Sequence, residues 1–584
     1  MTSIEKINLL RDLLGTLQID AYIILSSDEF QGEFTPECSQ RLGWLTNFSG
    51  SNGLAIITEN EYYFLTDSRY IIQAQQELPN DCQVFNIQDG SDIFDQIDSK
   101  LFIGYDPFIC TKKFIKDFIK KFIKDNEYIK LLPLENNLID QIWSRNKNFK
   151  TKSPLILNTK YTSETSGNKI NNLINKLKTE YILITSPESI CWLLNIRGND
   201  LKYTPVIMAY CLIDNKGNIE LFSNLRKINS TNIKIRIFHF RDIKNRIQEL
   251  NQQNKSIQFD YSQTPSWFID HFQKINTVIA KNPLDIAKAV KNNVELAGIK
   301  YAHIQDGIAL VKLSVWLEKK IASNDEVTEI DVDQALYNFK KQNTLFRSKS
   351  FDTISSFGQN SAIIHYNPYN GNNAILTNNH IFLLDSGSQY ECGTTDVTRT
   401  FFFGNPSDKQ KLHYTLVLKG IINLSTLIFP RKTCGSQIDA LARQFLWSYH
   451  LDYPHATGHG VGNYLSVHEG PNGINKFNNQ ELEPNMVVTI EPGYYIAQEY
   501  GIRIENIVVV KTVENNPNFL QLETMTLSPI AYNLIDKNLL TKREKKWLLH
   551  YHQKINDLLF PFLDDVEKKY LKKYVRFYTQ LNYN

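Results

Sequence analysis

The 584-residue chain lacks the features that mark several large classes of protein. No apolar run approaches the roughly 18 residues that a membrane-spanning helix needs, and residues 206–213 form one of the longest. The N-terminal stretch MTSIEKINLLRDLLG has no basic segment, unbroken apolar segment or small-residue cleavage site of a secretory signal. The formal charge is only +2, from 64 basic and 62 acidic side chains, unlike the basic excess of a nucleic-acid-binding protein. We therefore expect a cytoplasmic protein that binds neither a membrane nor nucleic acid.

Cysteine is also scarce. The seven cysteines, at positions 38, 82, 110, 191, 211, 392 and 434, are odd in number and form no CxxC pair. This pattern predicts reduced, mostly buried thiols rather than a disulfide framework. With 42% hydrophobic residues the chain can bury a core, which argues against disorder.

Two parts of the chain resemble each other. Residues 22–27 (YIILSS) and 181–186 (YILITS) each follow a helical-looking segment. The string WLTNFSG at 44–50 is echoed by WLLNIRG at 192–198. In both copies an apolar strand, a turn and a second strand follow. The repeat predicts two α/β domains of related fold.

The repeat places these two domains at residues 1–150 and 155–290. Neither contains His, Asp, Glu or Cys at ligand spacing, so we expect them to frame a site rather than to perform its chemistry. Apolar residues at three- and four-residue steps over 282–321 predict one or two long helices. Strands and helices follow, and the tail over 536–584 is helical in pattern. A third domain therefore occupies residues 291–584.

Four carboxylates of this third domain occupy strand ends or strand interiors. Asp385 ends the buried run IFLLD, and Asp396 lies in TTDVTRT, which reads as the next strand. Two strands joined in this way can bring both aspartates side by side on one face. Glu491 follows the apolar run VVTI, and Glu505 lies within GIRIENIVVV, which we interpret as one strand. A carboxylate among Ile and Val is costly unless it is paired, protonated or bound to a metal.

Histidines are concentrated in the same domain. His455 and His459 lie in the glycine-rich string HATGHGVG, and His468 follows nine residues after His459. Four carboxylates balance the charge of two divalent cations, and two metals about 3.5–4 Å apart lower the pKa of a shared water. An oxygen-rich set with one imidazole favours Mn²⁺ over a thiolate-type zinc site, with Zn²⁺ or Co²⁺ as alternatives.

Five residues follow one another in the order Asp385, Asp396, His459, Glu491 and Glu505. They lie in the strings LLDSG, TTDVTRT, HATGHGVG, IEPGYY and GIRIEN, with VHEGP between the third and fourth. This series resembles the pita-bread metallopeptidases, the family of methionine aminopeptidase, prolidase and aminopeptidase P. It is most similar to the cytosolic-type Xaa-Pro aminopeptidases (aminopeptidase P) over the whole chain. The resemblance implies two creatinase-like N-terminal α/β domains followed by a pita-bread catalytic domain.

By that resemblance, Asp385 holds one metal, His459 and Glu491 hold the other, and Asp396 and Glu505 bridge both. The implied reaction is attack by a hydroxide bridging the two metals on the first peptide bond of a chain with proline second. Proline has no backbone N–H and fixes the chain direction, so such peptides need a dedicated pocket.

The resemblance also implies roles outside the ligand set. His365, His455 and His468 match histidines that bind substrate or handle protons near neutral pH. His365 and His468 line the site and stabilise the polarised carbonyl, and Tyr495 contacts the substrate pocket. Glu491, besides holding a metal, receives the proton of the attacking hydroxide.

Arg503 lies two residues before Glu505. On one continuous strand, the period of two places both side chains on the same face. Arg503 is therefore a candidate for orienting the ligands from outside the ligand set.

Two other activities remain open. Prolidase, a dipeptidase, shares all five ligands, but its relatives usually carry a single N-terminal domain. A dipeptidase also needs a cation for the substrate carboxylate, and Arg399 and Arg503 are the only arginines of the catalytic motifs. The second alternative is a non-catalytic pita-bread binding module, against which the complete ligand set argues. The resemblance further implies a homodimer.

Overall fold

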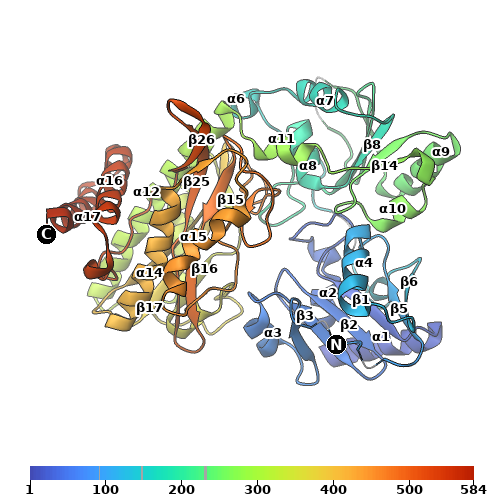
Figure 1. The fold of residues 1–584 in the computed structure, drawn as a ribbon, viewed down its shortest axis with the longest axis horizontal. Helices are drawn as coiled ribbons and strands as arrows, with labels where there is room; N and C mark the ends of the chain where they lie inside the picture. The colour runs from blue at the N-terminus through green and yellow to red at the C-terminus, as the bar shows by residue number, and fades with distance from the viewer. Residues whose placement is uncertain (91, 96, 147–148, 229–232, 584) are drawn as a thin grey trace. The chain divides into compact units, whose positions relative to one another are not determined.

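A computed structural model describes residues 1–90, 92–95, 97–146, 149–228, 233–583. The chain forms two structural units (Figure 1). Unit 1 comprises Met1–Asn158 and Glu164–Leu284, and unit 2 comprises Thr159–Ser163 and Asp285–Asn584. All seven cysteines are free, as predicted, and four of them are buried. Among the described residues, no helix combines the length and the apolarity needed to span a bilayer.

Unit 1 contains two six-stranded sheets of identical topology. The first has the order β4-β3-β2-β1-β5-β6 and the second the order β12-β11-β10-β8-β13-β14. In both sheets the central hairpin strands are antiparallel and the outer strands add in parallel. The strands of the first sheet are β1 (Ala21–Leu25), β2 (Leu54–Thr58), β3 (Tyr62–Thr66), β4 (Gln83–Asn86), β5 (Leu101–Tyr105) and β6 (Ile129–Pro133). Those of the second are β8 (Tyr181–Ile184), β10 (Ala209–Asp214), β11 (Ile219–Ser223), β12 (Ile235–Phe238), β13 (Ile257–Phe259) and β14 (Thr277–Ile279). The predicted pair of related α/β folds is confirmed.

The repeated WLxN string has the same local structure in both copies. Each string ends a helix, α2 (Arg41–Thr46) or α8 (Pro187–Leu194), and its asparagine takes the left-handed conformation that asparagine tolerates. A lysine from a preceding helix donates to the tryptophan carbonyl and to the asparagine Oδ1, at 2.5 and 3.0 Å in the first copy and 3.0 and 2.8 Å in the second. The residues are Lys6, Trp44 and Asn47 in the first copy, and Lys169, Trp192 and Asn195 in the second.

Unit 2 contains the carboxylate-bearing strands in two four-stranded sheets and two short hairpins. In the first sheet β17 pairs with β15, β16 and β18, and the second has the order β19-β26-β25-β22. The first sheet comprises β15 (Phe346–Lys349), β16 (Ile354–Phe357), β17 (Ile381–Tyr390) and β18 (Gly393–Phe402). The second comprises β19 (Ile428–Pro430), β22 (Val487–Ile490), β25 (Asn506–Val513) and β26 (Asn516–Thr524). The hairpins are β20 (Gly458–His459) with β21 (Gly473–Ile474), and β23 (Gly493–Ile496) with β24 (Tyr500–Arg503).

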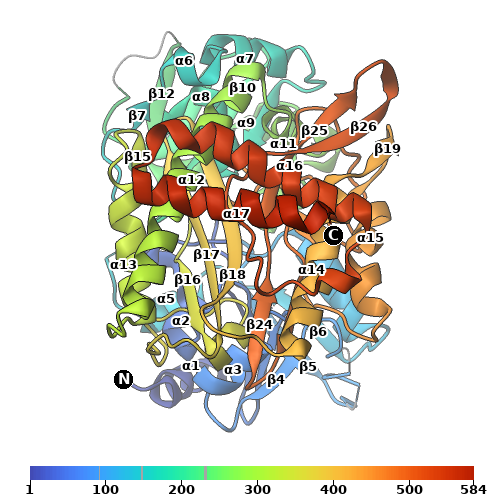
Figure 2. The ribbon, with the colours of Figure 1, turned by 90° about the vertical axis from the view of Figure 1, so that its left-hand side faces the viewer.

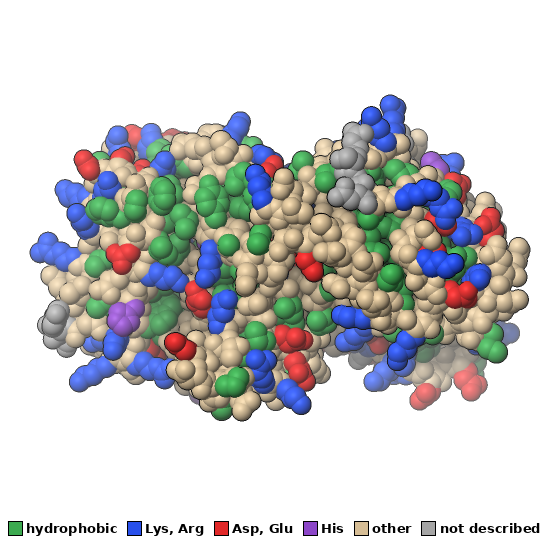
Figure 3. Space-filling model, turned by 90° about the horizontal axis from the view of Figure 1, so that it is seen from above, with side chains coloured by type: hydrophobic (Ala, Val, Ile, Leu, Met, Phe, Trp, Pro, Cys, Tyr) green, Lys and Arg blue, Asp and Glu red, His purple; other side chains and the backbone are tan. Residues whose placement is uncertain are grey.

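Helices accompany the strands of unit 2. The predicted long helices are α11 (Leu284–Ala289) and α12 (Asn293–Ala322), and α12 begins with a capping box between Asn292 and Glu295. The others are α13 (Glu329–Lys340), α14 (Asp408–Ser425) and α15 (Gly435–Trp447). Basic and acidic side chains are interspersed over the molecular face seen in Figure 3.

The C-terminal tail is an antiparallel helical pair that packs within unit 2. Helices α16 (Lys542–Leu559) and α17 (Asp565–Tyr583) lie against each other and against α12 (Figure 2). Leu548, Ile555 and Tyr578 of this pair are 0% exposed and belong to the same core as α14 and β25. The tail therefore covers part of unit 2.

Candidate metal centre

Two neighbouring strands carry the first pair of carboxylates. Across β17 and β18, Asp385 lies opposite Thr398 and Asp396 lies opposite Gly387. The aspartates are therefore diagonal neighbours on one face of the sheet, as the sequence predicts. With Glu505 they form a buried group whose ligand oxygens all lie within 4.8 Å of one another.

The structure corrects the prediction for Glu505. GIRIENIVVV is not one strand: β24 ends at Arg503 and β25 begins at Asn506. The chain here leaves the β23–β24 hairpin to join β22 and β26. At the break, the Glu505 amide donates to the Thr398 carbonyl at 3.1 Å, and the Thr398 hydroxyl donates to Glu505 Oε2 at 2.9 Å. The same-face argument for Arg503 is thus wrong, because no continuous strand links it to Glu505.

His459 and Glu491 are brought in by adjacent segments. The Glu491 amide donates to the carbonyl of residue 457 at 2.7 Å, and the His459 amide donates to the hydroxyl of Thr489 at 3.1 Å. A Cβ on Gly458 would lie 1.9 Å from the Thr489 carbonyl oxygen, so this close approach requires glycine. His459 Nε2 lies 3.5 Å from both Asp396 Oδ2 and Glu491 Oε1.

The tautomer of His459 follows from its other nitrogen. His459 Nδ1 lies 2.9 Å from the carbonyl oxygen of Gly460, which can only accept, so Nδ1 carries a proton. Nε2 then faces the carboxylates and is the nitrogen available to a cation. Burial alone would lower the pKa of His459, but Asp396 and Glu491 raise it to about 9. Without a cation, a second proton on Nε2 offsets part of the carboxylate charge.

The carboxylates carry the electrostatic marks of a cation site. Burial raises the pKa of Asp385 to about 7, with Arg503 opposing and Asp396 adding to the rise. Burial also raises the pKa values of Glu505 and Glu491. Among the described residues, Asp385 Oδ1 and Glu505 Oε1 are buried and have no hydrogen-bond partner. These unpartnered oxygens and the neighbouring imidazole fit a pair of divalent cations.

Arg503 connects Asp385 to two other predicted site residues. Its Nη2 donates to Asp385 Oδ2 at 2.7 Å and its Nη1 to the Tyr495 hydroxyl at 2.7 Å. The Tyr495 hydroxyl lies 2.9 Å from His455 Nε2. Because His455 Nδ1 donates to the carbonyl of Ala456 at 2.8 Å, Nε2 accepts, and Tyr495 is the donor. Arg503 therefore contacts Asp385, one of the predicted ligands. This contact does not depend on a strand shared with Glu505.

Of the remaining two histidines, His468 borders the site. The His468 ring centroid is 4.3 Å from that of His459, and His468 forms a group with Asp396 and His459 whose ligand atoms lie within 4.8 Å of one another. His468, expected outside the ligand set, thus lies at ligand distance. His365 follows Ile364, whose carbonyl accepts a hydrogen bond from Arg503 Nη2 at 3.4 Å.

Helix α15 holds residues 453–459, the histidine loop that carries His455 and His459, through contacts that no sequence motif predicts. Arg443 of α15 donates to the carbonyls of Tyr453 and His455, both at 2.7 Å, and pairs with Asp439 at 2.7 Å. Asp439 in turn accepts from the Thr457 hydroxyl at 2.5 Å. These two residues have ordinary i,i+4 helical spacing, so no motif distinguishes them.

A second missed contact holds the turn that follows His468. Lys291 Nζ donates to Glu469 Oε1 at 2.5 Å, and both side chains are 2% exposed. Lys288 adds a bond to the carbonyl of Gly470 at 3.2 Å. Both lysines precede α12 and lie almost 180 residues away in sequence, so local pattern could not reveal them.

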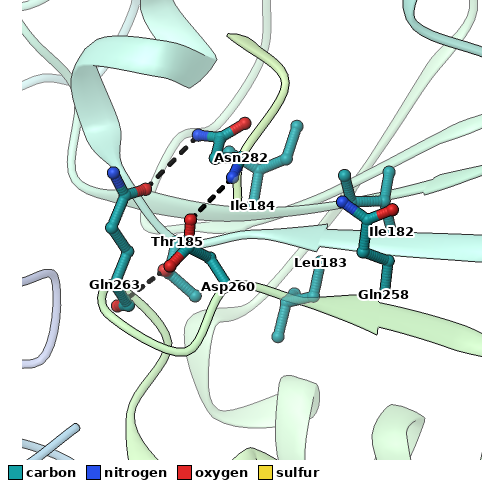
Figure 4. Close-up of a pocket in the computed structure, with 8 residues that line it drawn as sticks. All are labelled: Ile182, Leu183, Ile184, Thr185, Gln258, Asp260, Gln263 and Asn282. Atoms are coloured by element: carbon teal, nitrogen blue, oxygen red, sulfur yellow. Dashed lines mark hydrogen bonds between the residues drawn. The ribbon is translucent and has the colours of Figure 1, made fainter. Parts of the chain in front are cut away.

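A hollow in unit 1 offers no comparable chemistry. It lies at the ends of β8 and β13, and besides Gln258 its polar lining consists of Asn282, Asp260, Gln263 and Thr185 (Figure 4). The Asn282 amide donates to Asp260 at 2.6 Å, and Thr185 donates to the carbonyl of Gln263 at 3.0 Å. These groups thus pair with one another. In the described part of the chain, every cluster with metal-ligand geometry lies in unit 2.

Models of known families match the chain in four consecutive segments. The creatinase/prolidase N-terminal domain matches residues 6–141, and a second model of that domain matches 146–295. Metallopeptidase family M24 matches residues 297–512, and the C-terminal region of peptidase M24 matches 518–577. Together with the relatives below, these matches show that the chain belongs to metallopeptidase family M24. The predicted family and fold class are confirmed.

The chain is similar to named relatives over almost its full length. A probable Xaa-Pro aminopeptidase P of Laccaria bicolor is 36% identical over 96% of this chain and 91% of its own. The corresponding protein of Neurospora crassa is 35% identical over 96% and 86%. The crystal structure of X-prolyl aminopeptidase from Caenorhabditis elegans, a cytosolic enzyme with a di-nuclear active site, covers 100% of this chain and 99% of its own. It superposes with a TM-score of 0.91 at 31% identity.

Proposed function

We propose that the chain is a dimetal Xaa-Pro aminopeptidase, which hydrolyses the first peptide bond of a peptide with proline second and releases the first residue. The observation that carries this proposal is the convergence of the five predicted ligands, three of them buried, two of which keep an unpartnered oxygen. The names of the relatives support the substrate class.

The five ligands would share the two cations in the way the sequence resemblance implies. Asp385 would hold one, His459 and Glu491 the other, and Asp396 and Glu505 both. Mn²⁺ suits an oxygen-rich set with one imidazole best, and Zn²⁺ or Co²⁺ are the alternatives. Element analysis of the purified protein should find two divalent ions per chain. Glu505→Ala should lose both, and a variant that kept two ions and near-normal activity would contradict the assignment.

The chain's own groups divide the remaining chemistry. A pair of divalent cations in such a site supplies an acidified water and positive charge for the developing oxyanion. Glu491 would take the proton of that water, and its Oε1 accepts from the Thr489 hydroxyl at 3.4 Å. His365 and His468 would donate to the substrate carbonyl. The leaving proline nitrogen is a secondary amine and must gain a proton, which gives these histidines a second role.

A series of hydrogen bonds links the side chains of Arg503, Tyr495 and His455 next to Asp385. Arg503 holds Asp385 in one orientation, and the Tyr495 hydroxyl is held by Arg503 and bonded to His455. Burial raises the pKa of Tyr495 to about 12, with Arg503 opposing. Tyr495 therefore stays neutral at physiological pH and can contact a bound substrate as a hydrogen-bonding group.

Peptide length distinguishes this activity from that of a prolidase. Xaa-Pro peptides of two to five residues should be assayed with the metal-loaded protein. Peptides of three or more residues with a free amino terminus should lose their first residue, and N-acetylated versions should be inert because the anchoring amine is gone. Cleavage of dipeptides alone would replace the proposal by a prolidase activity.

Three further properties belong to the proposal. We place the domains at residues 1–150, 155–290 and 291–584. The seven free cysteines support a cytoplasmic location, where thiols stay reduced.

We also propose a homodimer. Phe562 and Val566, 57% and 63% exposed, leave apolar surface on the C-terminal tail. Sedimentation of a monomer at micromolar concentration would contradict the dimer.

A further inference from the structure

A fully buried guanidinium lies directly behind the bridging carboxylates. Arg399 follows Asp396 by three residues on β18 and is 2% exposed. Its seven hydrogen bonds all end on neutral oxygen atoms. A buried cation that bonds only to neutral groups is expensive. Arg399 therefore serves to hold these oxygens in place.

The guanidinium plane links two parts of unit 2. On one edge, Nη1 donates to the carbonyls of Thr398 and Glu505 at 2.8 and 2.6 Å. On the other edge, Nη2 donates to the Tyr551 hydroxyl and to the carbonyl of Ser528, both at 2.8 Å. The guanidinium is planar and rigid, so fixing one edge fixes the direction of the other.

Tyr551 holds the outer edge from helix α16. It is 5% exposed, and its hydroxyl lies 3.1 Å from the carbonyl of Thr526 and 3.0 Å from that of Ser528. Its ring stacks on Trp547 with centroids 5.0 Å apart. Residues 525–530 have no helix or strand of their own, so the hydrogen bond that the phenol donates to one of these carbonyls orders the segment that Arg399 also contacts.

We propose that Tyr551 is a positioning residue for the bridging carboxylates and acts through Arg399. The two carbonyls that Arg399 Nη1 holds belong to the segments of Asp396 and Glu505, which are joined by the bond from the Glu505 amide to the Thr398 carbonyl. The proposal gives the C-terminal helical pair a role in metal binding, and it rests on the metal site of the proposed function.

The test compares two tyrosines of the same helical pair. Tyr551→Phe removes the hydroxyl that meets Arg399. Tyr578→Phe is the matched control, because Tyr578 is 0% exposed and its hydroxyl donates to the carbonyl of Ile530 at 2.9 Å. Each variant loses one buried hydroxyl, but only the first touches Arg399. Amide hydrogen exchange of the metal-free protein and Mn²⁺ titration of the same samples are the two measurements.

In Tyr551→Phe the amide of Glu505 should exchange faster, and the Mn²⁺ dissociation constant should rise roughly 10- to 100-fold. Tyr578→Phe should leave both unchanged. Unchanged exchange and affinity in Tyr551→Phe, or the same changes in Tyr578→Phe, would overturn the proposal. Should Tyr551→Phe fail to fold, Arg399→Lys replaces it, with the same expected shifts. Failure of both to fold would overturn it too, since a positioning role predicts a folded protein with displaced ligands.

The two measurements separate this inference from the proposed function. If the wild-type protein bound no divalent metal, the proposed function would fail. The exchange of the Glu505 amide in the metal-free variants would still decide whether Tyr551 orders this segment.

Discussion

Removing the metals should make the stability of unit 2 fall as the pH rises. Asp385 has a pKa of about 7 in the folded protein against an ordinary value of 3.8. The folded state therefore binds this proton more tightly than the unfolded state does. Below about pH 4 both states are protonated and the carboxyl has no effect. As the pH rises towards 7, the unfolded state releases its proton and the folded state is destabilised relative to it.

The size of the effect follows from the two pKa values. The interval from 3.8 to about 7, at about 1.4 kcal/mol per pH unit, corresponds to about 4 kcal/mol for Asp385. His459 changes stability in the same direction over a higher range. Its pKa is raised from 6.5 to about 9, so the stability it contributes is full below 6.5 and lost by about 9. Both groups neighbour Asp396, so their contributions are not additive.

Calorimetry of chelator-treated protein between about pH 5 and pH 8 would measure this effect. The unit 2 transition is identified as the one that added Mn²⁺ raises. In wild-type protein without metal, its midpoint should fall with pH, and the stabilisation by Mn²⁺ should grow with pH because the ligands must lose protons to bind. Asp385→Asn cannot titrate and should show a shallower fall. A midpoint that rises from pH 5 to 7, or an equal slope in Asp385→Asn, would refute the reasoning.

Three substitutions test the groups around the ligands. His468→Ala should lower kcat roughly 10²–10⁴-fold with two metals retained, and loss of a metal would instead make His468 a ligand. Arg443→Met should leave Asp439 buried without its cation, lower the free energy of unfolding by about 3 kcal/mol and weaken metal binding. Unchanged metal affinity would show that the histidine loop keeps its conformation without Arg443. Lys291→Met should destabilise by a similar amount through Glu469, and a melting midpoint equal to that of the wild type would contradict the buried pair.

The local sequence pattern predicts the repeated α/β sheets, but it does not predict the break between β24 and β25. The repeat around Trp44 and Trp192 predicted two related sheets, because each copy carries its own helix end and hairpin within about 60 residues. GIRIENIVVV was interpreted as one strand because its apolar residues run on without interruption. The break at Glu505 arises where the chain changes sheets and bonds to Thr398 of β18. Thr398 and Glu505 lie 107 residues apart in the sequence, so the spacing of apolar residues cannot predict this contact.

In the candidate site, too, sequence motifs identify some residues and only the tertiary structure identifies others. The proposed ligands lie in recognisable strings, whereas the groups that hold their segments lie elsewhere. Arg399, Arg443 and Arg503 are the largest fully buried side chains of the described residues. Arg503 contacts a proposed ligand carboxylate directly, whereas Arg399 bonds only to neutral oxygens, and Arg443 pairs with Asp439 and Asp452 outside the cluster. Their charge can thus offset little of the carboxylate cluster, and neutralisation is left to the cations. That is the physical reason why burial raises the pKa values of Asp385 and Glu505 when the metals are absent.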